Sequence, residues 1–572
     1  MSLSANYPAV RPSLLLDFAN SKRLDPRITF TRATTATYYD GSTSAKAEEN
    51  MFLYSQVLTN GNWTNFSNRL TITDNYAAAP DGTTTAARVQ HTSGSTGYLY
   101  QNIGQFSVGE TWTISVYAKS NTGSSQTFNF MIPVTSSLSS NQTATTSWQR
   151  FTFTITISSA NNFAGIVLDT AANHDILFWG FQVEERSSVT SYFATTSTPI
   201  GTYVPALQTA SSGVARFDHN PVTSESLGLL IEQSRTNLMT YSADFSNAAW
   251  SKVRSSIIPN TIIAPDGTLT GSKLVEDNTA SNTHFILQNV SLGGSVDSSP
   301  FVVSIYAKAG ERTTMQMFDN NSVASGSTVF DLSTGKIVSG TGKITSVGNG
   351  WYRCSIYPLK DYATNSTAWI MLHNGSTNSY TGNGFSGIYI WGGQLEAASF
   401  ETSYIPTTGA SATRNADAVV MSGTNFSSWY TEGEGAFFAE ASTAVVTGDT
   451  MVAEGATATE PIQNFSLTFA TTSTQFINRL TSSSNDIRKS SAVASKTMVK
   501  FSGNMTGNTS LNIGSTSGTT ASSTGNQAKL TGADRMYIGS RTGSSLFLNA
   551  PIRKLAYYSE TLTQAQHNAL TS

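Results

Sequence analysis

Hydrophobic and polar residues alternate along most of this chain, and helical periodicity is almost absent. Trp112, Ile114, Val116 and Ala118 share one face of such a stretch, and residues 151–157 alternate in the same way. Turns rich in Gly, Asn and Ser separate these short runs. The pattern predicts an all-β fold made of antiparallel β-sandwiches, in which each sheet has one buried face.

One series of residues occurs twice in the same order. The offset grows from 187 residues between Trp63 and Trp250 to 212 residues between Trp179 and Trp391. A short repeat array would keep a fixed period of about 20–50 residues, so this growth indicates a duplicated domain with longer loops in its second copy. Residues that both copies share are expected to maintain the fold, and residues of one copy alone are free to be specific. The main pairs are Tyr54 and Tyr241, Trp63 and Trp250, Pro80 and Pro265, Tyr117 and Tyr306, Trp148 and Trp351, Arg150 and Arg353, Trp179 and Trp391, Gln182 and Gln394, Glu184 and Glu396, and Tyr192 and Tyr404.

The duplication sets the predicted domain boundaries. The two copies, here named copy one and copy two, are predicted to be jelly-roll-like β-sandwiches. The parts before and after copy one contain short strand-like stretches that cannot bury a core alone, so we expect them to form two halves of one module or to pack on a neighbour. The last part ends in a capping box at Thr563, which predicts a short closing helix. The predicted parts are 1–49 (first half of the module), 50–199 (copy one), 200–235 (connector and second half of the module), 236–412 (copy two) and 413–572 (a C-terminal sandwich).

Composition narrows the function. The net charge is −3 and only 12% of residues are charged, which argues against a nucleic-acid-binding protein. The single Cys354 excludes an internal disulfide framework, and its alternating surroundings predict a buried apolar role. No apolar run approaches the about 20 residues of a membrane span, so no membrane insertion is predicted. The first residues lack the pattern of a signal peptide, and we expect the protein to be made in a cytoplasm and released by another route, such as lysis.

Several segments resemble known families. The module segments resemble a module common in tailed-bacteriophage structural proteins, although copy one separates its halves here. The two copies are similar to carbohydrate-binding-module-like jelly rolls of the same proteins, and the C-terminal part resembles a concanavalin A-like (laminin G-like) sandwich. The segments that carry these resemblances are 30–38, 215–219, 228–232 and 235–238 for the module, 393–396 and 403–407 for the jelly rolls, and 552–558 for the C-terminal sandwich.

The resemblance implies a virion structural protein, namely a tail fibre or tail appendage. It implies that the module attaches the protein to other tail or baseplate proteins, that the sandwiches bind a host-surface glycan, and that the chain forms a homotrimer. Linked weak sites in such an oligomer would raise the effective concentration of the glycan. The expected location is the virion tail.

A search for catalytic motifs finds none. The six histidines are scattered, and no H-E-x-x-H, G-x-S-x-G or P-loop pattern is present. The C-terminal part also lacks the E-x-D-x-x-E string of glycosidases on concanavalin A-like folds, and the repeated Glu184 and Glu396 are predicted to be structural. We therefore predict no enzyme. The alternatives are a glycan depolymerase with dispersed acids, and a ligand-free spacer or capsid decoration protein.

Aromatic residues that only one copy has are the candidate carbohydrate-binding residues, because sugar CH groups pack on aromatic ring faces. These are Tyr98 and Tyr100 in copy one and Tyr362 and Tyr380 in copy two. Copy two has 25 extra residues between its first and last shared tryptophans, so specificity is expected there and copy one is expected to be a spacer.

No cofactor is predicted. The segments 276–278 and 319–321 hold oxygen ligands suitable for a structural Ca²⁺, but the chain has no D-x-D-x-D-G loop to support one.

Overall fold

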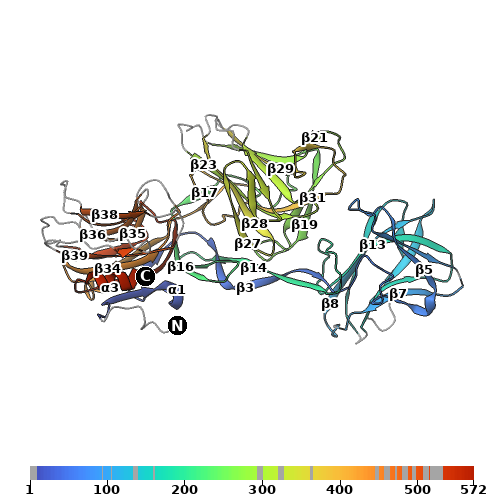
Figure 1. The fold of residues 1–572 in the computed structure, drawn as a ribbon, viewed down its shortest axis with the longest axis horizontal. Coiled ribbons are helices and arrows are strands. Elements are labelled where there is room, and N and C mark those ends of the chain that lie inside the picture. Colours follow the sequence, from blue (N-terminus) through green and yellow to red (C-terminus); the bar gives the residue numbers. More distant parts are fainter. Residues whose placement is uncertain are drawn as a thin grey trace.

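The computed structural model describes residues 10–571 apart from Ser93, Gln105 and several loop segments. The segments outside the description are 133–138, 159–161, 293–299, 320–326, 361–364, 445–449, 457–463, 471–472, 480–486, 493–497, 507–513 and 516–531. The described chain forms three β-sandwiches joined by a long two-stranded ribbon (Figure 1). All of its described strand pairs are antiparallel, which confirms the predicted all-β fold.

Copy one is a sandwich of two described five-stranded sheets around one core. Trp112 and Ile114, predicted to share a face, are both buried in that core. The first sheet has the order β10-β9-β12-β7-β4, with β4 (Thr64–Asn65), β7 (Gly97–Asn102), β9 (Gln126–Met131), β10 (Gln142–Ala144) and β12 (Phe163–Leu168). The second has the order β11-β8-β13-β6-β5, with β5 (Leu70–Ala77), β6 (Ala86–His91), β8 (Thr111–Ser120), β11 (Gln149–Thr156) and β13 (His174–Glu184).

Copy two repeats this arrangement with two described six-stranded sheets. Cys354 lies fully buried in its core, as predicted, and burial raises the pKa of its thiol. The first sheet has the order β18-β22-β29-β24-β25-β26, with β18 (Ser251–Val253), β22 (Phe285–Ser291), β24 (Thr314–Asp319), β25 (Thr328–Asp331), β26 (Lys336–Ser339) and β29 (Asn365–His373). The second has the order β19-β20-β31-β23-β28-β27, with β19 (Ser255–Ile262), β20 (Gly271–Glu276), β23 (Pro300–Ala309), β27 (Gly342–Gly348), β28 (Trp351–Lys360) and β31 (Gly387–Glu396). Two small pairs join it, β21 (Asn282–Thr283) with β30 (Ser379–Tyr380), and β17 (Arg235–Asn237) with β32 (Ala412–Arg414).

The C-terminal sandwich recruits strands from far upstream. The segments before and after copy one form no separate module, because β1, β2 and β16 pair with strands of residues 413–572 and β15 pairs with β16. Their apolar residues Leu16 and Leu229 complete its core, since such short strands can be buried only on a neighbour. One sheet contains β1 (Leu14–Asp17), β15 (Phe217–His219), β16 (Ser226–Ile231), β34 (Glu434–Ala441), β39 (Val499–Thr506), β40 (Gly514–Ser515) and β42 (Ala550–Tyr558). The other contains β2 (Thr29–Thr31), β33 (Ala418–Ser422), β35 (Thr450–Ala456), β36 (Asn464–Ala470), β37 (Ser473–Arg479), β38 (Ile487–Ala492) and β41 (Arg535–Ile538).

A two-stranded ribbon carries copy one away from the C-terminal sandwich. It consists of β3 (Ala36–Asn50) and β14 (Ile200–Ala210), which leave the C-terminal sandwich, pass along copy two and enter copy one (Figure 1). Glu48 of the ribbon forms an ion pair with Lys308 of copy two and accepts a hydrogen bond from Asn349 Nδ2 at 2.6 Å. Figure 1 shows copy one at one end of the molecule's long axis and the C-terminal sandwich at the other.

Helices are few and short in the described chain. They are α1 (Phe18–Ser21), α2 (Thr424–Ser427), α3 (Gln564–Thr571) and the 3₁₀ helix η1 (Phe66–Asn68). The predicted capping box is confirmed at α3, because Gln566 N donates to Thr563 Oγ1 at 3.3 Å and Thr563 N donates to Gln566 Oε1 at 2.7 Å.

The repeated Trp-Gly-x-Gln motif marks a bulge in the last strand of each copy. The register of β13 against β8 shifts between Trp179 and Gln182, and Gly180 there has φ +69°. Its counterpart Gly392 has φ +62°, a conformation that favours glycine. A Cβ on Gly180 would also lie 3.2 Å from the Tyr192 ring, so the glycine provides both the bend and the room for the shared tyrosine.

Candidate carbohydrate-binding faces

Two tyrosines of β7 point out of the copy-one sandwich. Tyr98 and Tyr100 alternate along the strand with the buried Leu99 and Gln101. Because successive side chains of a strand point to opposite faces, both rings lie on the outer face of the sheet. Both side chains are partly exposed, and the described part of the chain offers neither hydroxyl a hydrogen-bond partner.

Further aromatic rings extend this surface. Phe66 meets Tyr98 edge-on with ring centroids 6.0 Å apart, and Phe163 meets Tyr100 in the same way at 4.9 Å. Phe66 is 46% exposed, and the Arg69 guanidinium lies 5.8 Å from its ring centroid. We call Phe66, Tyr98, Tyr100 and Phe163 the copy-one aromatic face. It combines apolar ring surface with phenol hydroxyls and one cation, which suits the CH faces and hydroxyl groups of a sugar.

The backbone sets the positions of these rings. Gly165 on β12 lies directly opposite Tyr100. A Cβ on Gly165 would lie 2.0 Å from the Leu99 oxygen and 2.6 Å from Tyr100 Cα, so only glycine allows this approach. On the inner side, Gln101 accepts a hydrogen bond from Leu53 N at 2.9 Å and donates one to Leu53 O at 2.5 Å. The strand that carries the tyrosines is therefore fixed from both faces.

Copy two has no phenol at the equivalent positions. The pairing of β22 with β18 aligns Phe285 and Leu287 with Tyr98 and Tyr100. Trp369 of β29 lies opposite Leu287. Phe285 is only 5% exposed, and both residues at the aligned positions lack a hydroxyl. The exposed tyrosine pair is thus a property of copy one.

Trp369 is the aromatic residue that sequence reasoning missed. It stacks on Phe285 with centroids 4.3 Å apart and planes at 10°, and it meets Phe318 edge-on at 5.9 Å. Its indole Nε1 is buried and has no partner among the described residues. No tryptophan occupies the equivalent position of copy one, so a comparison of the copies that included tryptophan would have selected it.

The structure does not present Tyr380 as an exposed platform. Tyr380 belongs to the core of copy two and is 8% exposed. Its hydroxyl donates to Glu276 Oε2 at 2.7 Å, and Arg312 lies 4.9 Å from its ring while it pairs with Glu276 at 2.6 Å. A buried carboxylate needs such donors, and this requirement holds the tyrosine inside. Tyr362 lies outside the described residues.

The repeated glutamates make structural hydrogen bonds, as predicted. Thr190 N donates to Glu184 Oε2 at 3.1 Å, and Thr402 N donates to Glu396 Oε2 at 3.0 Å. Each carboxylate also accepts a bond from the hydroxyl of the same threonine. Burial raises the pKa of both carboxyls, and both lie inside the protein away from any open face.

No metal site emerges from the described part of the chain, where no group of three or more His, Cys, Asp or Glu can hold an ion. Of the candidate calcium ligands, Glu276 is bound to Arg312, and Asp277 accepts hydrogen bonds from Thr279. Among the described helices, none has the length and apolar character needed to cross a membrane.

Comparison with known proteins places this chain near several β-sandwich structures. No protein-family model and no curated protein matches it. The chain is similar to the CBM40 of the Ruminococcus gnavus IT-sialidase bound to α2,3-sialyllactose, with 14% identity over 26% of this chain and 88% of that one and a TM-score of 0.23. It is similar to the tandem CBM22 domains of Paenibacillus barcinonensis Xyn10C, with 12% identity over 62% and 99% and a TM-score of 0.21. It is also similar to domains LG4-5 of the mouse laminin alpha1 chain, with 10% identity over 48% and 85% and a TM-score of 0.16. Similarity at this level assigns neither a family nor a ligand to the chain.

Proposed function

We propose that this chain binds a glycan through the copy-one aromatic face. The observation that carries the proposal is the pair of partly exposed tyrosines, Tyr98 and Tyr100, whose hydroxyls are free of partners within the described chain and whose rings continue into Phe66 and Phe163. Rings of this kind offer a flat apolar surface to sugar CH groups and a polar edge to sugar hydroxyls.

The place of copy one in the molecule supports this proposal. It lies at the end of the ribbon, at the far end of the long axis from the C-terminal sandwich (Figure 1). A domain in that position is accessible to a large polysaccharide. The sequence predicts copy one as a spacer and copy two as the specific domain, whereas the proposal gives the binding role to copy one, because copy two buries Tyr380 and has no phenol at the positions of Tyr98 and Tyr100.

We further propose that the setting is a virion tail fibre or appendage, acting by binding without catalysis and as a homotrimer. The resemblance of the segments 30–38 and 228–232 to phage structural proteins supports this setting. In this proposal the C-terminal sandwich, which these segments complete, is the end that attaches to other tail proteins. Antibodies to that sandwich should label tails in electron micrographs of particles. Label on capsids, or particles without label, would contradict the setting.

The Tyr98→Ala/Tyr100→Ala double variant is expected to weaken glycan binding about five- to 150-fold, because each of the two ring contacts contributes about 0.5–1.5 kcal/mol. The measurement is binding to a glycan array, followed by calorimetric titration of the best polysaccharide. Tyr203→Ala is the matched control, since Tyr203 is a 61% exposed tyrosine of the ribbon outside the face.

Equal binding by the double variant and the wild type would refute the role of this face. The same incubations should be assayed for new reducing ends. Their appearance with the wild-type protein would establish the depolymerase alternative in place of a binding-only role.

A further inference from the structure

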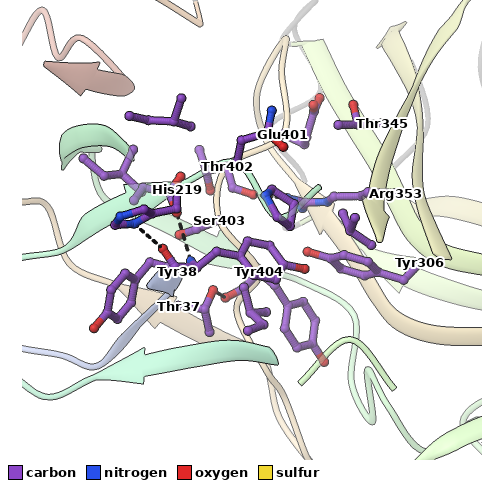
Figure 2. Close-up of a pocket in the computed structure, with 18 of the residues that line it drawn as sticks. Thr37, Tyr38, His219, Tyr306, Thr345, Arg353, Glu401, Thr402, Ser403 and Tyr404 are labelled. Carbon is purple, nitrogen blue, oxygen red and sulfur yellow. Dashed lines mark hydrogen bonds between the residues drawn. The ribbon is translucent and has the colours of Figure 1, made fainter. Parts of the chain in front are cut away.

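A cavity of about 320 Å³ lies where the ribbon, the C-terminal sandwich and copy two meet (Figure 2). The ribbon contributes Tyr38 and Tyr39, and the hairpin of β15 and β16 contributes His219. Copy two contributes Tyr306 and Arg353. At the rim, Thr345 of β27 is exposed, so the cavity is open to solvent on that side.

His219 lines this cavity and has an unused acceptor. Its Nδ1 lies 2.9 Å from Phe217 O and 3.2 Å from Tyr39 O. Both partners only accept, so the proton is on Nδ1 and the lone pair is on Nε2. His219 is 2% exposed, and Nε2 is buried without a partner among the described residues. Gly41 packs against the ring and fixes it, since a Cβ there would lie 2.3 Å from His219 Cδ2.

Tyr39 presents an unused hydroxyl. The side chain is 8% exposed, and within the described chain its Oη is buried without a partner. Burial raises the pKa of Tyr39 well above its usual value, so the phenol keeps its proton and can donate. A buried hydroxyl or imidazole nitrogen without a partner costs about 1–3 kcal/mol, which a bound molecule can recover.

The charged residues of the lining disfavour an anionic ligand, because the lining holds two cations, Lys343 and Arg353, and three carboxylates, Asp218, Glu232 and Glu401. Arg353 donates to Thr402 O at 2.6 Å and to Ser304 Oγ at 3.0 Å. Lys343 pairs with Glu401 at 2.5 Å. The carboxylate of Asp218 in particular would oppose a further negative charge. The lining therefore suits a neutral ligand.

A second cavity, at the equivalent place on copy one, shows which features belong to the sandwich fold that both copies share. A cavity of about 430 Å³ lies against copy two, lined by Tyr117 and Arg150, the counterparts of Tyr306 and Arg353. Among the described residues, Arg150 Nε and Arg353 Nε both lack a partner, so this feature belongs to the shared sandwich. The unused atoms of Tyr39 and His219 come from outside copy two and occur only in the cavity of Figure 2.

We infer that the cavity lined by Tyr39 and His219 is a binding site for one neutral sugar ring or a polyol of similar size. Sugar hydroxyls both donate and accept, so different hydroxyls of one ring can donate to the His219 acceptor and accept from the Tyr39 donor. The volume is at the low end of the about 300–1,000 Å³ of ligand pockets, which fits one sugar ring. The site is independent of the copy-one aromatic face.

The test is a titration of the full chain with D-glucose, D-galactose, D-mannose and glycerol, followed by calorimetry and ligand-observed NMR. At least one of these probes should bind, and Tyr39→Phe should weaken that binding about five- to tenfold, because it removes one hydrogen bond and leaves the ring in place. His219→Phe should weaken it as well. Tyr117→Phe is the matched control in the other cavity and should bind like the wild type.

Absence of binding by all four probes, or equal binding by wild type and Tyr39→Phe, would overturn the inference and leave a joint that holds only water. If Tyr39→Phe changes the melting temperature, far-UV circular dichroism distinguishes a folding defect from a loss of ligand. Tyr98→Ala/Tyr100→Ala should keep monosaccharide binding, and Tyr39→Phe should keep polysaccharide binding, so failure of either proposal is visible separately.

Discussion

Replacing Arg216 with alanine is expected to destabilise the C-terminal sandwich and its joint with copy two by about 3–5 kcal/mol, the usual effect of removing one partner from a buried ion pair. Arg216 is fully buried. Its Nη2 donates to Asp417 Oδ2 at 2.6 Å, and its Nη1 donates to Glu232 Oε2 at 2.8 Å. Nη1 also lies 2.9 Å from Ser403 Oγ of copy two and 3.0 Å from Thr37 O of the ribbon. The variant would remove contacts to three parts of the chain at once.

The charges around Arg216 depend on one another. Arg32 donates to Asp417 Oδ1 at 2.9 Å, and Arg414 donates to Glu232 Oε2 at 2.5 Å. Burial opposes the ionisation of Glu232, but Arg414 and Arg216 outweigh it and hold the pKa of Glu232 at about 2. Without Arg216, two buried carboxylates would share two arginines that already have other hydrogen bonds.

Equilibrium unfolding in urea measures this effect. Arg553→Ala is the control, because Arg553 pairs with Glu225, which is 56% exposed, and with Glu440, and an exposed pair contributes about 0–1 kcal/mol. A loss below about 1 kcal/mol for Arg216→Ala would show that the network does not stabilise the joint.

The shared residues were the part of the structure that the sequence predicted best. Trp179 Nε1 donates to Thr85 Oγ1 at 2.9 Å, and Trp391 Nε1 donates to Thr270 Oγ1 at 3.0 Å. A contact that recurs in both copies is local to one sandwich, so duplication reveals it. The expectation that the repeated tryptophans maintain the fold rests on this kind of comparison.

Contacts between the parts could not be found in the same way. Arg32 and Asp417 form an ion pair across 385 positions, and copy one and copy two both lie between them in the sequence. Neither residue has a counterpart in a second copy, and no local pattern brings them together. The short strands around copy one were recognised as unable to fold alone, but their partner strands in the C-terminal sandwich were not identified.

The candidate sugar-binding residues were selected because only one copy has them, and this criterion does not detect a buried charge that requires a donor. Tyr380 has polar neighbours typical of an exposed loop, yet Glu276 takes its hydroxyl into the core. Tyr98 and Tyr100 have no such buried partner and stay on the surface. Glu276 is buried because it belongs to β20, whose residues are all buried. The residues next to Tyr380 in the sequence give no sign of this burial.

His567 is expected to make the C-terminal sandwich sensitive to acid. It lies on α3, is 0% exposed, and its Nδ1 is 2.7 Å from Ser502 Oγ of β39. Burial lowers the pKa of His567 to about 4 from the usual 6.5. The unfolded chain therefore binds a proton below about pH 6.5 that the folded chain refuses. The stability that comes from burying a neutral His567 is fully present above pH 6.5 and is lost as pH falls towards 4. The loss in the free energy of unfolding is about 3 kcal/mol in total.

Amide hydrogen exchange in α3 and β39, followed from pH 7 to pH 4 and corrected for the intrinsic pH dependence of exchange, measures this loss where it occurs. His567→Gln keeps a side chain that can bond Ser502 but removes the titration, so its protection should change far less over the same range. Asp218 titrates in the opposite direction, because its raised pKa of about 6 adds stability as pH falls, and it is present in both proteins and cancels in the comparison. Parallel profiles for wild type and His567→Gln would assign the acid sensitivity to another group.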